Sequence, residues 1–516
     1  MNTAGNLGAI IDTSRDLDKV ALIGVDGKPE APARHYTYRD IDALANSVAR
    51  TLAARGYAPG SRIALLAANS VPYVAAVLGI MRTGLIAVPV NFKFPAALIA
   101  YVLADSGAEL VFYDAARRDA LPPTIDAVAL AAADGTPLAG FADPGSFDAV
   151  QPASADTPAL MLYTSGSTGK PKGVLLSHVS HLWIVNTRRI ATPLDDERAL
   201  IAAPLYHMNA LALMLLSLAS HATTVLLPQF NAAEYLRAIA QYRCTWLTAV
   251  PPMIAMLLQE KALIATTDLS SVRVIRMGSA PVSPSLLTAI HHLLPNARVI
   301  NAYGTTEGGP VVFGPHPEGK PTPPLSVGYP HPAVSIRLDR GGDEGEHDLV
   351  NSENQGILAL KSPGVMLGYH QRPDVMYPIS ADGFYSTGDV FRRDADGFYY
   401  FVGRRDDMFV SGGENIYPGE VEKMLEQHPA VEQAVVVPVD DDIKGQKPVA
   451  FVVRREGGTV DAQALKTYAL ENAPAYQHPR QVWFVDNFPL ASTNKIDRSA
   501  LKADAAARLK DLARQS

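Results

Sequence analysis

Short apolar runs alternate with amphipathic segments along most of the chain. Runs rich in leucine, isoleucine, valine and threonine predict strands at residues 62–69, 159–164, 223–228 and 272–278. Residues 40–56 carry apolar side chains at helical spacing and end at a glycine, which predicts an amphipathic helix. This alternation is typical of layered α/β folds with largely parallel sheets. We therefore expect an α/β body before residue 400.

The pattern changes near residue 400. Residues 403–415 are dense in glycine, arginine and aspartate, as in a polar joint between domains. Beyond this joint the sequence predicts a helix, two strands and a second helix, in GEVEKMLEQH, VEQAVVVPV, KPVAFVVRR and AQALKTYALENA. The end of the chain from residue 502 is rich in alanine, lysine and arginine, and we expect a loosely held helix there. The simplest organisation is a small α+β domain of about 110 residues behind a large domain.

Composition narrows the class of protein. The chain has 516 residues, of which 48% are hydrophobic, so it can form more than one domain and a large core. Its formal net charge is −7 and it has no long basic run, so we expect no nucleic-acid partner. The single cysteine, Cys244, excludes an internal disulfide, a cysteine-rich zinc site and a two-cysteine redox centre. Cys244 lies in an apolar stretch and is interpreted as a small buried thiol, with a single catalytic cysteine as the alternative.

The N-terminus lacks the cationic start and apolar core of a signal peptide. No apolar run reaches the ~20 residues of a membrane-spanning helix. We therefore expect a cytoplasmic protein without an integral membrane segment.

A loop rich in glycine and hydroxyl side chains follows the strand predicted at 159–164. Its sequence, YTSGSTGKPKG, covers residues 163–173. Glycines let backbone N–H groups approach an anion, hydroxyl groups add donors, and lysines add positive charge. The loop is not a Walker A motif, because Pro171 follows Lys170 where that motif requires serine or threonine. A flexible turn is the alternative, but the density of such residues favours a triphosphate site.

The string TSGSTGKPKG resembles the phosphate loop of the adenylate-forming superfamily, which includes acyl-CoA synthetases, adenylation domains of peptide synthetases and firefly luciferase. Four further motifs of this superfamily occur in order, in NAYGTTEGG (301–309), FYSTGDVFRRDADGFYYFVGRRDDM (384–408), SGGENIYPGEVE (411–422) and PLASTNKIDRSAL (489–501). The resemblance spans essentially the whole chain. It implies a large, layered, multi-subdomain α/β N-terminal domain at 1–403, a hinge at 404–406, and a small mobile α+β C-terminal domain at 407–516.

The resemblance implies a two-step reaction that uses ATP, Mg²⁺ and coenzyme A. A carboxylate attacks the α-phosphate of ATP, which gives an acyl-adenylate and pyrophosphate, and the CoA thiol then displaces AMP. A carboxylic acid of pKa ~4 is already ionised at neutral pH, so the first step needs cations rather than a general base. The nucleotide-binding residues implied are Thr164, Ser165, Gly166, Ser167, Thr168, Gly169, Lys172, Tyr303, Thr306, Asp389 and Arg404.

Individual roles follow from the same resemblance. Glu307 would bind Mg²⁺, and one carboxylate suffices because substrate phosphates supply other ligands. Thr306 would donate to the α-phosphate, and Tyr303 would stack on adenine. Asp389 would accept hydrogen bonds from the ribose hydroxyls, with Arg404 near the ribose and phosphates.

The resemblance also implies that the small domain rotates about Asp406 between the two half-reactions. In one pose Lys495 reaches the reacting carboxylate and the α-phosphate. In the other pose Lys495 is withdrawn, and the loop at Gly412 and Gly413 helps to form the CoA tunnel. Asn494 precedes this lysine where the family commonly has glycine, and asparagine tolerates a positive φ.

The segment PLYHMNALALMLL (204–216) resembles the region around a histidine in acyl- and aryl-CoA synthetases. His207 would border the acyl pocket and take part in the thiol step, with a purely structural histidine as the alternative. An amino-acid substrate is not expected, because no aspartate follows His207 to pair with an ammonium group. The other pocket positions implied are Trp183, Met208, Gly278, Ala280, Gly304, Gly309 and Pro310.

These pocket positions are uncharged and mostly small. No arginine or lysine among them pairs with a second carboxylate, so a dicarboxylate such as malonate is disfavoured. Residues 308–311 resemble coumarate- and benzoate-type CoA ligases. We therefore expect an aromatic or medium-chain monocarboxylic acid as the small-molecule substrate.

Other functions stay open on the sequence. A stand-alone adenylating enzyme would load the acyl group onto a carrier-protein phosphopantetheine, although we expect no carrier domain after Lys495. A luciferase-like oxygenase is chemically possible on this fold. A non-enzymatic binding module is disfavoured because Lys495, Glu307 and Asp389 are all present. We expect a monomer or a homodimer.

Overall fold

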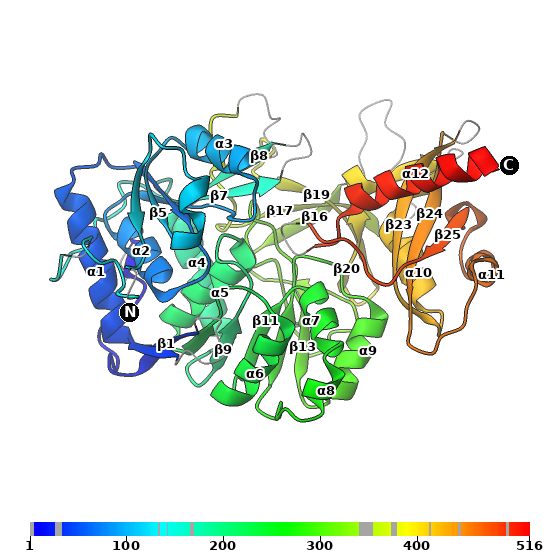
Figure 1. Cartoon of the computed structure of the whole chain (residues 1–516), viewed down its shortest axis with the longest axis horizontal. Helices are drawn as coiled ribbons and strands as arrows, with labels where there is room; N and C mark the ends of the chain where they lie inside the picture. The colour runs from blue at the N-terminus through cyan, green and yellow to red at the C-terminus, as the bar shows by residue number, and fades with distance from the viewer. Residues whose placement is uncertain are drawn as a thin grey trace.

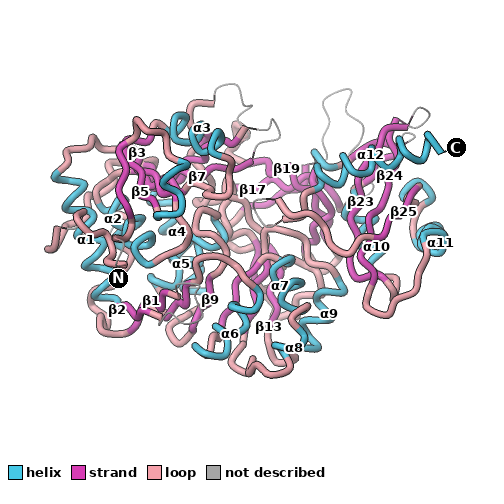
Figure 2. Tube along the Cα trace, viewed as in Figure 1, coloured by secondary structure: helices cyan, strands magenta, loops and turns pink. Residues whose placement is uncertain are grey.

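The computed structural model has two large sheets in its N-terminal part and a separate sheet near the C-terminus (Figure 1). It describes residues 5–25, 33–132, 135–141, 143–165, 170–339, 354–372, 379–411, 414–441, 445–491 and 495–515. Strands and helices alternate through the N-terminal part (Figure 2). The predicted α/β class, with a large N-terminal domain and a smaller C-terminal one, is confirmed.

The first sheet is parallel except at one edge, where β2 runs antiparallel to β1. In spatial order it contains β13 (Arg298–Asn301), β12 (Val274–Met277), β11 (Trp246–Ala249), β9 (Arg198–Ile201), β10 (Thr223–Leu226), β1 (Val20–Gly24) and β2 (Arg34–Thr37). Strands β10, β11 and β12 are buried along their whole length, as parallel strands covered on both faces are. β10 and β12 confirm two of the predicted strands. β12 also carries a charged residue, Arg276, which is only 8% exposed.

The second sheet ends in a long hairpin. In spatial order it contains β18 (Gly368–Tyr369), β8 (Pro171–Ser177), β7 (Pro158–Ser165), β4 (Ile86–Pro89), β3 (Arg62–Leu66), β5 (Ala108–Tyr113) and β6 (Asp126–Ala129). β3 and β7 confirm the other two predicted strands. β7 and β8 pair in an antiparallel hairpin that joins the two ends of the glycine-rich loop.

Helices fill the space between and around these sheets. The predicted amphipathic helix is α1 (Tyr38–Ala54), whose start is fixed by a capping box between Thr37 and Asp40. Helices α2 (Val71–Arg82) and α5 (Met208–Ala219) are apolar almost all round and line a common internal gap, as buried helices do. The other helices of the described N-terminal part are α3 (Ala96–Ser106), α4 (His178–Ala191), α6 (Ala232–Tyr242), α7 (Pro251–Leu258), α8 (Lys261–Ile264) and α9 (Pro284–Leu293).

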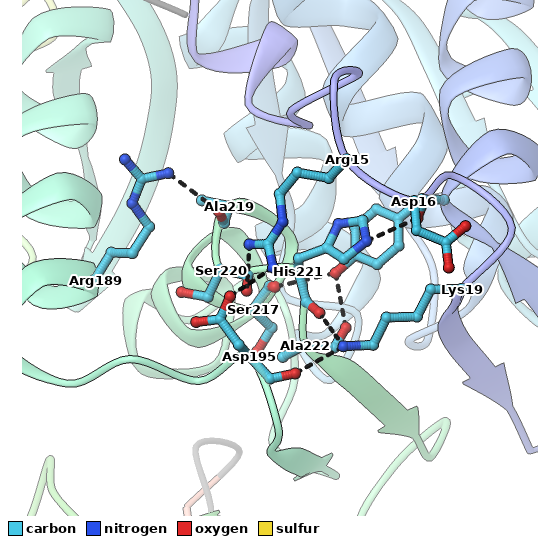
Figure 3. Close-up of polar contacts among 11 residues, drawn as sticks. Arg15, Asp16, Lys19, Arg189, Asp195, Ser217, Ala219, Ser220, His221 and Ala222 are labelled. Carbon is cyan, nitrogen blue, oxygen red and sulfur yellow. Dashed lines mark hydrogen bonds and ion pairs between the residues drawn. The ribbon is translucent and has the colours of Figure 1, made fainter. Parts of the chain in front are cut away.

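The segment before β1 is tied to the turn between α5 and β10 by polar contacts (Figure 3). Arg15 forms an ion pair with Asp195 at an N–O distance of 2.6 Å. Lys19 donates to the backbone carbonyls of Asp195 and His221 at 2.7 and 2.6 Å. The His221 ring bonds the Asp16 carbonyl at 2.7 Å. These bonds satisfy carbonyls of the turn, of the loop after α4 and of the N-terminal segment itself, so the segment is fixed on the body.

A smaller antiparallel sheet connects the body to the C-terminal part. It contains β16 (Ser335–Asp339), β17 (Gln355–Lys361), β19 (Tyr385–Arg393) and β20 (Tyr399–Arg404), and the short pair β14 (Phe313–Gly314) and β15 (Tyr329–Pro330) precedes it. The C-terminal sheet contains β22 (Glu414–Ile416), β21 (Phe409–Ser411), β24 (Gly445–Arg454), β23 (Val431–Asp441) and β25 (Gln481–Phe484). Its helices are α10 (Pro418–Glu426), α11 (Ala462–Asn472) and α12 (Arg498–Gln515).

The described apolar core divides at the connection after β20. Large clusters lie before this point and others after it, and only a small cluster around Val402 and Tyr417 joins the two sides. A single 3₁₀ turn, Arg405–Asp407, makes the connection. The Lys423 ammonium bridges the two sides by donating to the Phe401 carbonyl at 2.7 Å. This division supports the predicted domain limits, which stay a prediction.

Burial decides two further expectations. Helix α12 is not loosely held, because Leu501 and Ala505 are 3% and 0% exposed and pack on the C-terminal sheet. Cys244 is fully buried, as predicted for a small apolar thiol. Among the described residues, no helix combines the length and apolarity that crossing a membrane requires.

Candidate active site

A buried carboxylate lies at the centre of the predicted nucleotide site. Asp389 is 5% exposed and faces Arg404 across β19 and β20, with 3.7 Å between Oδ1 and the Arg404 Nε. The Tyr303 hydroxyl donates to Asp389 Oδ2 at 2.6 Å. Burial raises the pKa of Asp389, while Arg404 and the tyrosine hydroxyl oppose that shift. Three residues predicted to hold the nucleoside are therefore in contact.

A second group of predicted residues meets at the base of the glycine-rich hairpin. The Thr164 hydroxyl at the end of β7 donates to Glu307 Oε1 at 3.2 Å, and Tyr369 donates to the same oxygen at 3.2 Å. The Lys172 ammonium lies 4.7 Å from the centre of the Tyr369 ring. The phosphate loop and the predicted metal ligand are thus neighbours, although 143 residues separate them. Tyr369 was not predicted, because it lies outside every motif.

The Glu307 carboxylate is half-buried and offers the hard oxygen ligand that Mg²⁺ prefers. In the part of the chain that the structure describes, no three side chains of the metal-binding kind cluster together. A divalent cation at Glu307 would therefore take most of its ligands from phosphates and water. The donor chemistry fits Mg²⁺ held jointly by one carboxylate and a triphosphate.

The turn that carries Glu307 is built from close backbone contacts. A Cβ at Gly304 would lie 2.6 Å from the Pro310 Cα, so only glycine fits there. Gly309 has a φ of +78°, and a Cβ on it would lie 3.0 Å from the Gly364 carbonyl oxygen. The Glu307 carbonyl accepts from the Met366 N–H at 2.7 Å, which fixes the turn against the next segment. Thr306, predicted to contact the α-phosphate, is half-buried beside Glu307.

Lys495 lies near the Asp389 group and near His207. Its charge acts on Asp389 and on His207, and the positive charge of Arg404 acts on it in turn. Although part of the side chain is exposed, burial of its charged end and the Arg404 charge lower the pKa of Lys495. The Lys495 carbonyl accepts from the Ala491 N–H at 2.7 Å, which closes the loop that carries the lysine. A C-terminal residue is thus brought to the predicted nucleotide and acyl sites.

His207 precedes α5, and its imidazole is neutral near pH 7. Burial, together with nearby Lys495 and Lys93, lowers its pKa to about 3. Its Nε2 is buried and has no hydrogen-bond partner among the described residues. So low a pKa makes His207 a weak base, which favours a role at the acyl pocket over removal of a thiol proton.

The predicted acyl-pocket residues lie on several elements, and close contacts are seen around three of them. Trp183 on α4 packs on Gly364, where a Cβ would lie 3.0 Å from its ring. The next residue, Ile184, lies within 3.3 Å of a Cβ at Gly309. Because Gly278 has no side chain, the chain after β12 packs closely on the residue after β13. A Cβ at Gly278 would lie 3.2 Å from the Ala302 carbonyl oxygen. The rest of the set is Met208, which is 7% exposed, Gly304, Pro310 and half-buried Ala280.

Sequence reasoning missed two positive charges beside this pocket. The Arg276 guanidinium donates to Asn209 Oδ1 at 3.1 Å, directly after Met208. The charge of Arg188 on α4 acts on Arg276. The predicted pocket positions themselves contain no arginine, but Arg276 bonds the residue next to one of them. The sequence signal was Arg276, the second arginine of VRVIRMG, which interrupts an apolar run.

Some predicted residues cannot be placed. Gly166, Ser167, Thr168, Gly169, Gly412 and Gly413 lie outside the described residues, as does the side chain of Ser165. Asp406, the predicted hinge, lies in the 3₁₀ turn after β20, with its carboxylate 3.5 Å from the Arg405 Nε.

This chain is similar to known proteins over most of its length. A family model for AMP-binding enzymes matches residues 12–370, and the model for the C-terminal domain of these enzymes matches residues 420–495. The chain is 33% identical over 468 residues to a feruloyl-CoA synthase of Amycolatopsis sp, which covers 89% of this chain and 92% of the relative. It is 34% identical over 483 residues to a sulfoacetate–CoA ligase of Cupriavidus necator, with coverage of 90% and 92%. The crystal structure of ATP-bound MatB from Rhodopseudomonas palustris superposes with a TM-score of 0.85 at 27% identity and covers 97% of this chain and 99% of that one.

Proposed function

The chain belongs to the AMP-binding enzyme family, and on that premise we propose that it activates a carboxylic acid with ATP and transfers the acyl group to coenzyme A. The predicted class, an AMP-forming acid–thiol ligase, is confirmed by the family and by the CoA ligases among its relatives. ATP binding and CoA as the co-substrate follow from the family.

The observation that carries the proposal is the convergence of Lys495, Asp389 and Glu307 from distant parts of the chain on one site. In the first step two anions, the carboxylate and the triphosphate, must approach each other. Lys495 and Lys172 supply positive charge for this step, and preorganised charges of this kind usually contribute most to such catalysis. When bound, Mg²⁺ would offset phosphate charge at Glu307.

The remaining roles are those predicted from the motifs. Asp389 holds the ribose hydroxyls, with Tyr303 against adenine and Arg404 beside the phosphates. Thr164 and Thr306 donate to phosphate oxygens. The low pKa of His207 leaves it a neutral wall of the acyl pocket.

Removal of the lysine tests the mechanism. We expect Lys495→Ala to slow acyl-adenylate formation by at least ~10²-fold, the size of effect seen when one preorganised charge donor is lost. Conversion of a supplied acyl-adenylate and CoA into the thioester should be nearly unchanged, because that step does not need Lys495. Pyrophosphate release measures the first step, and AMP release from supplied adenylate measures the second.

Lys502→Ala is the matched control, because Lys502 is an exposed lysine on α12 of the same domain. It should leave both steps unchanged. Equal loss of both steps in Lys495→Ala would refute the assigned role.

An alternative acceptor is a phosphopantetheinylated carrier protein. The two acceptors are distinguished by offering free CoA and such a carrier in parallel, with AMP release as the readout. Faster turnover with the carrier would replace the CoA proposal. A cytoplasmic location and a monomeric or homodimeric state stay predictions.

A further inference from the structure

Two arginines, buried Arg276 and half-buried Arg188, lie beside the predicted acyl pocket, and neither has an acidic partner among the described residues. Arg276 is 8% exposed, and the one side chain it bonds is the neutral amide of Asn209. Arg188 lies close enough for its charge to disfavour that of Arg276. A buried guanidinium without an anion is costly, and a second one nearby increases the cost.

The neighbouring polar groups add donors rather than negative charge. Asn209 uses its oxygen to accept from Arg276, so its amide nitrogen faces away, and that nitrogen is buried without a partner. Thr248 lies directly opposite Arg276 on the adjacent strand, so both side chains are on the same face of the sheet. The Thr248 hydroxyl is also buried without a partner. Buried polar atoms are normally paired, so several unpaired donors around two cations point to a missing acceptor.

Arg276, Asn209 and Arg188 lie on β12, α5 and α4, next to predicted residues of the acyl pocket. Arg276 lies in the last two residues of β12, and the predicted pocket residue Gly278 follows directly after the strand. Asn209 lies in the first turn of α5, next to Met208. Arg188 is one helical turn beyond Ile184, the α4 residue that contacts Gly309.

We propose that the acid substrate carries a second anionic group, a carboxylate or a sulfonate, which binds to Arg276 and Arg188 at the inner end of the pocket. This inference rests on the proposed function, because it identifies the acid that the ligase activates. Guanidinium groups suit the task, since their fork of N–H donors matches the oxygens of a carboxylate or sulfonate.

The positive charge of Arg276 and Arg188 favours a second anionic group over an uncharged tail or a neutral hydroxyl group on the substrate. An uncharged alkyl or aryl tail would leave both guanidinium groups uncompensated and would also bury them further. A neutral hydroxyl on an aromatic acid would satisfy one donor but neither positive charge. A second anion compensates the charges and accepts from several donors at once. The charge of these two arginines therefore favours a dianionic acid over the monocarboxylic acid expected from the sequence.

A panel of matched acids tests the proposal on the wild-type enzyme. Each dianion is paired with the monoanion it extends: sulfoacetate with acetate, succinate with propionate, and 1,4-benzenedicarboxylate with benzoate. 4-Hydroxybenzoate represents the neutral hydroxyl. With ATP and CoA present, pyrophosphate release should give a kcat/KM at least tenfold higher for one or more dianions than for its partner. Equal or better use of the monoanions, or of 4-hydroxybenzoate, would overturn the proposal.

Variants separate ligand binding from a structural role. Arg276→Met and Arg188→Met should raise KM for the preferred dianion at least tenfold, while the paired monoanion is used as well as before or better. The melting temperature should not fall, because an apolar side chain replaces a buried unpaired charge. Arg276→Lys, which keeps the charge, should recover part of the dianion activity.

Arg189→Met is the matched control, because Arg189 is the next residue on α4 and donates to the Ala219 carbonyl instead. It should leave the preference for the dianion unchanged. A lower melting temperature together with equal loss for both acids in Arg276→Met would show a purely structural role and overturn the proposal.

The experiments distinguish a wrong assignment of the second anionic group from a wrong assignment of the ligase activity. If the enzyme forms AMP and a thioester from monoanions alone, the ligase assignment stands and the second anionic group is refuted. If no acid releases pyrophosphate, calorimetric titration with the same dianions in the presence of ATP decides the inference. Binding lost in Arg276→Met would support it, and absence of binding would refute it.

Discussion

Replacement of Tyr303 by phenylalanine isolates one hydrogen bond of the nucleotide site. The ring remains, so any stacking on adenine and the edge-to-face contact with Phe391, 4.7 Å between ring centres, are kept. Only the hydroxyl that donates to Asp389 at 2.6 Å is lost. Asp389 is 5% exposed, so bulk water has little access to replace that donor.

The size of the effect follows from the charge on the acceptor. A hydrogen bond to an ionised group contributes ~1.5–3 kcal/mol, and one pKa unit corresponds to ~1.4 kcal/mol. The hydroxyl stabilises the ionised form of Asp389, so its loss should raise the pKa of Asp389 further. Burial already raises this pKa in the native enzyme, and the substitution adds to that shift.

The assay is the pH profile of kcat/KM for ATP, which reports ionisations of the free enzyme. If the Asp389 carboxylate must be ionised to hold the ribose, the acidic limb of the profile should move up by ~1–2 pH units in Tyr303→Phe. At alkaline pH the two enzymes should be nearly equal, because Asp389 is ionised in both. An unmoved acidic limb, or an equal loss at every pH, would refute the reasoning.

Tyr399→Phe is the control for this experiment. Tyr399 is 5% exposed and its ring lies 5.2 Å from Phe313 in the same aromatic cluster. Its hydroxyl interacts with Arg393 rather than with Asp389. The acidic limb should therefore stay in place.

Three further predictions concern groups outside the site. Burial lowers the pKa of His178 and of His181 to about 4, so unfolding takes up protons between pH 6.5 and 4, and the melting temperature should fall as the pH drops through that window. Each histidine accounts for up to ~3 kcal/mol of this loss, and a flat profile would contradict it. Cys244→Ala should leave turnover unchanged, because burial raises the pKa of this thiol to about 12; lost turnover at an unchanged melting temperature would disprove the prediction. Tyr38→Phe removes the 2.7 Å bond to the Ala222 carbonyl and should lower the free energy of unfolding in urea by ~1–2 kcal/mol, whereas no change would show that the bond contributes nothing.

The local elements of this protein follow from its sequence. Continuous apolar runs predicted the parallel strands, because strands covered on both faces carry few polar side chains. Helical periodicity and the Thr37–Asp40 capping box fixed α1, since both act within a few residues. The end of the chain was misjudged, because the apolar stripe of Leu501 and Ala505 is too narrow to reveal that a sheet covers it.

The chemistry of the nucleotide site could also be predicted from the sequence. Glycines, hydroxyl groups and lysines in one loop are what phosphates require, and ordered motifs supplied the roles of Glu307, Asp389 and Lys495. Their meeting is a tertiary result. Tyr303 and Asp389 are 86 residues apart, and the donor–acceptor pair exists only because the turn after β13 packs against β19.

The charged groups beside the acyl pocket were the part of the site that only the tertiary structure revealed. A strand pattern shows that Arg276 interrupts an apolar run, but it does not show what lies opposite the side chain. Its bond to Asn209 spans 67 residues and joins a strand to a helix of another layer. Periodicity reports whether a position is buried, whereas the balance of charge depends on which buried groups are neighbours. The sequence alone therefore determined the family and the reaction class, and the packing of layers decided which charges the acid meets.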